Sequence, residues 1–72
     1  MPTSMYPVNS SQISYIGYDE ITKELFITFK NGSIYKYEDV PLFKFNNMKA
    51  NSSVGKYFNM YIKDIYISTK IK

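Results

Sequence analysis

The chain carries a strong hairpin signal in the run Leu25-Phe26-Ile27-Thr28-Phe29-Lys30-Asn31-Gly32-Ser33-Ile34-Tyr35-Lys36-Tyr37. Both halves of this run are rich in β-branched and aromatic residues, which favour strands. The dipeptide between them, Asn31-Gly32, is typical of tight hairpin turns. The run therefore predicts two antiparallel strands over residues 25–29 and 33–38.

The loop length sets the register of this hairpin, and two lengths are compatible with the sequence. A two-residue turn would divide the large side chains between the two faces of the sheet. A three-residue loop over 30–32, with Gly32 in the left-handed region, gathers them on one face, and we favour it. Its pairs are Phe29 with Ser33, Ile27 with Tyr35 and Leu25 with Tyr37.

Working outward from the hairpin, residues 12–18 predict a preceding strand and residues 19–24 a polar turn. Pro41 suits the first position of a short helix over 41–48. A longer helix is expected over 54–66, with an N-cap hydroxyl from Ser52-Ser53. The apolar positions of these two helices that should face inward are Leu42, Phe45 and Met48 or Ala50 in the first, and Val54, Phe58, Tyr61, Ile62 and Ile65 in the second. Gly55 costs about 1 kcal/mol relative to alanine in a helix, which indicates a close backbone approach.

These elements predict one α+β domain, in which a three-stranded antiparallel meander packs against a single layer of two C-terminal helices. Residues 1–10 are expected to be a flexible lead-in, residues 11–67 the domain, and residues 68–72 a basic tail. A chain of 72 residues holds one domain at most. Aromatic residues make up 18% of it, enough to build a dense core without any cysteine.

The composition also limits the function. The chain has no His, no Cys and no Arg, so it lacks the usual general base, thiol nucleophile and transition-state clamp. We therefore expect no enzyme, no metal and no cofactor. With neither a signal-peptide run nor an apolar stretch of about 20 residues, we expect a cytoplasmic protein that is not in a membrane.

Two tyrosines on one strand face, Tyr35 and Tyr37, are open to two interpretations. Aromatic side chains exposed on a sheet can stack nucleic-acid bases. Aromatic side chains on the inner face are simply part of the core, with their hydroxyls at its rim. The three-residue hairpin loop favours the second interpretation.

Lys56, Asn59 and Lys63 follow one another at helical spacing, and they form either a phosphate-facing stripe or merely the solvated face of an amphipathic helix. The net charge is +3, modest for a dedicated nucleic-acid binder. Ser53, Gly55 and the free amides at the start of this helix likewise fit either an anion site or a plain N-cap.

Taken together, several short motifs resemble the KTSC domain. They are Ser11-x-Ile13-x-x-Ile16-Gly17-Tyr18-Asp19, Leu25-x-Ile27-x-Phe29, Asn31-Gly32, Tyr35-x-Tyr37, Val40-Pro41 and Ser53-x-Gly55-Lys56-Tyr57-Phe58-Asn59-x-x-Ile62-Lys63-x-x-Tyr66. The resemblance covers residues 10–66. Such domains occur at the C-terminus of some lysyl-tRNA synthetases and alone in small bacterial and phage proteins.

The resemblance implies a small accessory binding module without an established activity, for which the synthetase context suggests RNA as the ligand. Two hypotheses follow. The first is a non-catalytic module that binds RNA or another nucleic acid, with binding residues Tyr35, Tyr37, Ser53, Gly55, Lys56, Asn59 and Lys63. The second is a protein-interaction module, such as a phage-encoded inhibitor of a host protein, or a homodimer formed through an exposed strand edge.

Overall fold

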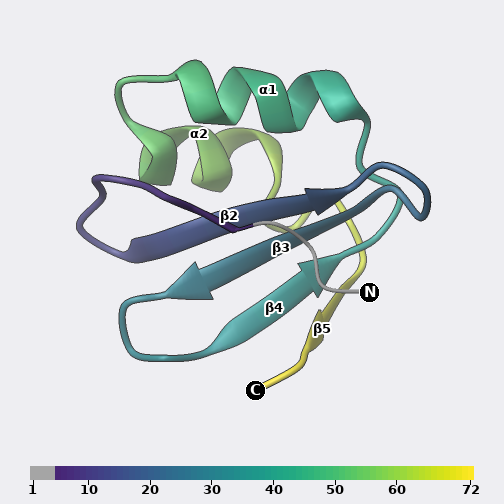
Figure 1. Ribbon diagram of the computed structural model, residues 1–72, viewed down its shortest axis with the longest axis horizontal. Helices are drawn as coiled ribbons and strands as arrows, with labels where there is room; N and C mark the ends of the chain where they lie inside the picture. Colours follow the sequence, from purple (N-terminus) through teal and green to yellow (C-terminus); the bar gives the residue numbers. More distant parts are fainter. Residues whose placement is uncertain (1–4) are drawn as a thin grey trace.

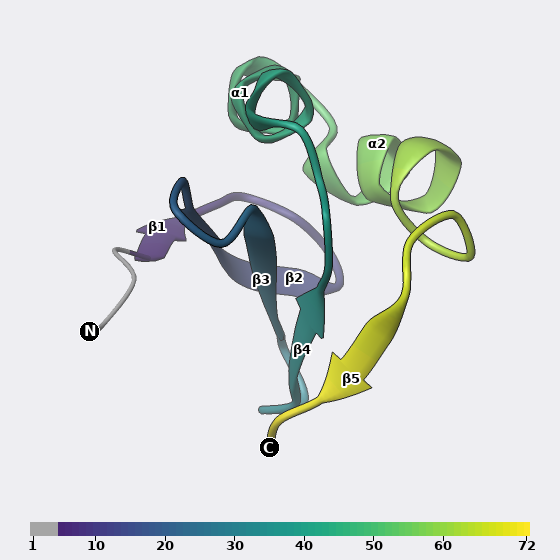
Figure 2. The ribbon, with the colours of Figure 1, turned by 90° about the vertical axis from the view of Figure 1, so that its right-hand side faces the viewer.

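The structure, a computed structural model, describes residues 5–72 and consists of one antiparallel sheet with two helices on one of its faces (Figure 1, Figure 2). The elements in chain order are β1 (Met5–Pro7), β2 (Ile13–Asp19), β3 (Glu24–Phe29), β4 (Ile34–Tyr37), α1 (Leu42–Ala50), α2 (Val54–Tyr61) and β5 (Ser68–Lys70). The sheet order is β1-β2-β3-β4-β5, with every neighbouring pair antiparallel. Among residues 5–72, no helix is long and apolar enough to cross a membrane.

The β3–β4 hairpin has the register that the hydrophobic pattern favoured. Leu25 pairs with Tyr37 and Ile27 with Tyr35. The Phe29 amide donates to the Ser33 carbonyl, which closes the three-residue loop. Gly32 has a φ of 94°, a conformation that side chains rarely adopt.

Strand β2 contains a bulge that brings two isoleucines to the same face. Ile13 pairs with Phe29 and Tyr15 with Thr28, so Ser14 is the extra residue. In a regular strand, Ile13 and Ile16 would point to opposite faces, because they are three residues apart and side chains alternate along a strand; the bulge corrects this alternation by one residue. Both are fully buried, and they belong to the core between the sheet and the helices.

The prediction of three strands is wrong, because the expected flexible lead-in and the expected basic tail each add a strand at one edge of the sheet. Residues 5–7 of the expected flexible lead-in form β1 and pair with β2, while residues 1–4 lie outside the described residues. Residues 68–70 of the expected tail form β5 and pair with β4. Both strands are three residues long and exposed, so they lack the alternating pattern that reveals a strand in sequence.

Helix α1 begins one residue after Pro41, which is its N-cap, and runs two residues beyond the predicted end. Phe45 and Met48 are buried as predicted, whereas Leu42 is 40% exposed. Ala50, the alternative inward position, is exposed as well.

Helix α2 ends at Tyr61 and not at Tyr66. The amides of Ile62 and Lys63 both donate to the Phe58 carbonyl, and Asp64 then adopts a positive φ of 65°, which turns the chain away from the helix. Val54, Phe58 and Ile62 are buried as predicted. Tyr61 and Ile65, also predicted to face inward, are 44% and 56% exposed. Tyr61 is the last residue of the helix and packs its ring against Tyr57, whereas Ile65 lies beyond the helix end.

Candidate binding cleft

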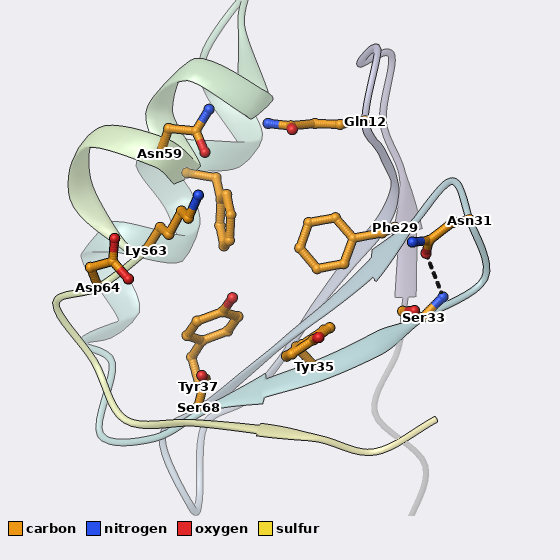
Figure 3. Close-up of a pocket in the computed structure, with 11 residues that line it drawn as sticks. Gln12, Phe29, Asn31, Ser33, Tyr35, Tyr37, Asn59, Lys63, Asp64 and Ser68 are labelled. Carbon is orange, nitrogen blue, oxygen red and sulfur yellow. Dashed lines mark hydrogen bonds between the residues drawn. The ribbon is translucent and has the colours of Figure 1, made fainter.

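A cleft of about 400 Å³ opens between α2 and the inner face of the sheet, and we call it the aromatic cleft (Figure 3). Its side chains come from β3, β4, α2 and β5 and from the segments next to these elements and to β2. Its lining residues are Gln12, Phe29, Asn31, Ser33, Tyr35, Tyr37, Phe58, Asn59, Lys63, Asp64 and Ser68.

Four aromatic rings, from β3, β4 and α2, meet at nearly right angles in the wall of this cleft. The ring of Phe29 contacts that of Tyr35 at 5.5 Å and 84°, and that of Phe58 at 5.6 Å and 73°. Tyr37 contacts Phe58 at 5.5 Å and 77°. Edge-to-face contacts of this kind hold each ring in a fixed orientation.

The rings of this wall differ in how much they face solvent. Phe58 and Tyr37 are 3% and 6% exposed, so they belong chiefly to the core. Phe29 and Tyr35 are only partly buried. The hairpin register thus places both tyrosines on the core side, as the second interpretation required, while leaving Tyr35 accessible from the cleft.

The polar side chains around the aromatic wall supply hydrogen-bond donors, acceptors and one cation. Figure 3 shows the Lys63 ammonium and the Tyr37 hydroxyl directed into the cleft, with the amides of Gln12 and Asn59 facing one another across its upper side. Burial, and to a lesser extent Tyr35 and the Asp64 carboxylate, raises the pKa of Tyr37. The Tyr37 hydroxyl therefore keeps its proton at neutral pH and is available as a donor.

A second hollow of about 420 Å³ adjoins the aromatic cleft at the start of α2, and we call it the serine hollow. It shares Gln12 and Asn59 with the aromatic cleft. Its lining residues are Asn9, Ser10, Ser11, Gln12, Ser52, Ser53, Val54, Gly55, Lys56 and Asn59.

Gly55 allows the segment before β2 to lie directly against α2. A Cβ atom at this position would come 3.0 Å from the Ser10 hydroxyl oxygen and 3.1 Å from the Gln12 side-chain nitrogen. The close approach expected at Gly55 is therefore present, and the approaching group is this polar segment. Ser53 is the N-cap residue, but its hydroxyl makes no capping hydrogen bond, contrary to the prediction. Its backbone amide instead donates to the Asn51 side chain at 2.9 Å.

All seven residues predicted to bind a ligand line one or both of these hollows. Tyr35, Tyr37 and Lys63 line the aromatic cleft, Ser53, Gly55 and Lys56 line the serine hollow, and Asn59 lines both. Gln12, which also lines both hollows, was not among the predicted residues, because nothing in its local sequence indicates that it meets α2. Gly55 was the available signal that some group approaches there.

The two cationic side chains that line these hollows, Lys56 and Lys63, are not engaged elsewhere in the described part of the chain, unlike Lys36 and Lys44. Lys36 forms an ion pair with Glu24 at 3.1 Å, and Lys44 donates to the Tyr61 carbonyl at 3.2 Å. Within residues 5–72, the ammonium groups of Lys56 and Lys63 make neither an ion pair nor a hydrogen bond. Over the same residues, no three side chains of the His, Cys, Asp or Glu type gather to form a metal site.

The fold and the cleft define a small α+β domain with one helical layer on an antiparallel sheet. A sequence model of the KTSC domain matches residues 9–66, and the chain therefore belongs to the KTSC domain family. The crystal structure of a KTSC domain protein from Yersinia pestis superposes with a TM-score of 0.92 at 35% identity, covering 99% of this chain and 100% of that one.

Two relatives support the same assignment. A protein of Tsukamurella paurometabola is 37% identical over 59 residues, which cover 82% of this chain and 88% of the relative. A protein of Stutzerimonas stutzeri is 32% identical over 56 residues, covering 78% of this chain and 79% of the relative.

Proposed function

We propose that this protein is a non-catalytic module that binds single-stranded RNA across the aromatic cleft and the serine hollow. The observation that carries the proposal is the combination found in the aromatic cleft: partly accessible rings next to amide side chains and an unengaged lysine. Proteins that bind single strands combine stacking platforms with cations that follow the phosphates.

The positions of the cations support this function. Lys56 and Lys63 are exposed on and just after α2, at the serine hollow and the aromatic cleft respectively. A strand passing from one hollow to the other would meet both ammonium groups. Two or three such contacts give weak binding that depends strongly on salt, because each neutralised phosphate releases counterions.

Fluorescence anisotropy with labelled single-stranded RNA, duplex RNA and tRNA, at low and at physiological salt, tests this proposal. We expect saturable binding of the single strand at micromolar protein and a clear loss of affinity at the higher salt. Lys56→Glu with Lys63→Glu should abolish binding. Absence of binding to all three RNAs at low salt would refute the proposal.

A matched control separates a local contact from the effect of net charge. Lys23 lies in the turn between β2 and β3 and lines neither hollow. Lys23→Glu changes the net charge by the same amount as Lys63→Glu. We expect Lys63→Glu to weaken binding by at least about fivefold more than Lys23→Glu, because a cation beside the phosphate binds it more strongly than a cation screened by salt at a distance.

Protein interaction is the second candidate function, and exposed apolar side chains on the helices and just after α2 favour it. Phe43, Met60 and Ile65 are 59%, 58% and 56% exposed. The strand edges are less suited to such a partner, because β1 and β5 already cover β2 and β4 and are themselves only three residues long. A partner bound through Phe43, Met60 and Ile65 would remain bound at moderate salt, unlike RNA.

A further inference from the structure

We propose that the aromatic cleft accepts one unstacked adenine base of the bound strand, stacked on Tyr35, flanked by Phe29 and read at its edge by Asn59 and Gln12. This inference rests on the proposed function and adds to it the part of the RNA that enters the cleft. Four properties of the cleft support it, namely its size, its wall, its polar edge and its charge.

The cleft has the dimensions of a site for one small planar group. Its volume of about 400 Å³ lies at the lower end of the range for ligand pockets, roughly 300 to 1,000 Å³. Phe29 and Tyr35 are partly buried and in edge-to-face contact, so an accessible aromatic surface exists before any ligand binds. A base that has left its stack regains a stacking partner on such a surface.

The two amides at the upper side of the cleft suit the edge of an adenine. Each offers one acceptor oxygen and one donor nitrogen, and adenine presents the complementary donor and acceptor next to each other on its edge. Figure 3 shows the Gln12 and Asn59 amides facing one another from different elements. Gly55 makes this arrangement possible, because the Gln12 side-chain nitrogen lies 3.1 Å from the place of a Cβ atom there.

The charged groups of the cleft favour adenine over a cationic ligand and over guanine. Lys63 points into the cleft and, although Asp64 lines the cleft as well, disfavours a cationic group next to the aromatic rings. Guanine is bound by arginine or lysine, but this chain has no arginine, and a lysine lacks the planar fork that fixes the orientation of the base. Lys63 is placed instead to bind the phosphate next to the inserted base.

Binding of U-tract RNA heptamers that differ only at the central position tests the proposal. The central position carries A, G, C, U or an abasic sugar, so the phosphates stay constant. We expect the A-containing strand to bind about tenfold more tightly than the U-containing strand, with the abasic strand weakest. Equal affinity for the A-containing and abasic strands, or equal affinity for A and G, would overturn adenine insertion while leaving RNA binding intact. Absence of binding to any heptamer would instead refute the proposed function.

Variants of the cleft give an independent test. Asn59 is exposed on α2, so Asn59→Leu should fold and should reduce the ratio of affinities for the A- and U-containing strands to about one. Tyr35→Phe keeps the ring and should retain most of the affinity, whereas Tyr35→Ala should lose about tenfold, within the range for one stacked base. An unchanged A-to-U ratio in Asn59→Leu, measured on protein with wild-type circular dichroism, would overturn the assignment of the amide edge.

Discussion

Replacing Gly55 by alanine probes how closely the segment before β2 lies against helix α2. The new Cβ atom would come 3.0 Å from the Ser10 hydroxyl oxygen and 3.1 Å from the Gln12 side-chain nitrogen, so at least one of these side chains must move. Ser10 cannot move without loss, because its hydroxyl accepts hydrogen bonds from the amides of Gln12 at 3.2 Å and Ile13 at 3.3 Å.

Two effects of opposite sign determine the stability of the Gly55→Ala variant. Alanine is favoured over glycine by up to about 1 kcal/mol within a helix, and by less in the first turn, where residue 55 lies. Displacing Ser10 breaks two long hydrogen bonds of about 0.5 to 1 kcal/mol each, and the shift of Gln12 adds to this cost. We expect a net destabilisation of about 1 kcal/mol, which lowers the Tm by about 4 to 8 °C in a domain of this size.

Urea and thermal unfolding followed by circular dichroism measure this difference, and a double-mutant cycle with Ser10→Ala locates its cause. Removing the hydroxyl should make Gly55→Ala less destabilising by about 1 kcal/mol than it is in the wild type. Gly55→Leu should be considerably worse than Gly55→Ala in both backgrounds. The reasoning fails if Gly55→Ala is as stable as the wild type or more so, because helix propensity would then outweigh the steric conflict.

Three further predictions concern the core, the pH dependence and the hairpin. Ile27 is fully buried and Ile21 is 93% exposed. In urea unfolding, Ile27→Ala should therefore lower the free energy of unfolding by about 2 to 5 kcal/mol and Ile21→Ala by less than about 0.5 kcal/mol. Similar losses in the two variants would contradict the assigned core. Burial raises the pKa of Tyr37 in the folded state above the unfolded value of about 10. As the pH rises from the unfolded to the folded pKa, only the unfolded chain ionises this hydroxyl, so the stability that Tyr37 contributes is complete below the unfolded pKa and is lost through the folded one. Between pH 8 and 11, the free energy of unfolding should therefore fall less steeply with pH for Tyr37→Phe than for the wild type. Parallel pH curves for the two proteins would refute this prediction. Gly32 has room for a side chain but a φ of 94°, so Gly32→Ala should cost about 1 kcal/mol from backbone strain alone, and a neutral effect on Tm would argue against that conformation.

The sequence predicted the centre of the sheet well because the pattern there has a strict period. Only the three-residue loop puts Leu25, Ile27 and Tyr37 on one face, so burial alone selects the register. The strands β1 and β5 have no such pattern. They exist because β2 and β4 offer unpaired backbone groups at the edges, a cause that lies outside their own sequence.

The candidate site was only half visible in the sequence for a similar reason. Helical spacing brings Lys56, Asn59 and Lys63 near one another, and strand alternation does the same for the two tyrosines. That these two groups meet around one cleft depends on how α2 packs over β3 and β4, which periodicity does not contain. The place where α2 ends was missed because Asp64 adopts its left-handed conformation within an otherwise regular helical pattern.

The strand β5 forms one side of the aromatic cleft, and it can separate from the sheet without unfolding of the rest of the domain. It is held to β4 mainly by backbone hydrogen bonds, and its three residues are exposed. Ser68 lines the cleft, and the chain reaches β5 from Lys63 and Asp64, which line it as well. In hydrogen exchange, the amides of β5 should open by fraying well before those of β3. Because Ser68 belongs to β5, each such opening would also open the cleft on this side, while the amide of Lys63 stays bonded to the Phe58 carbonyl.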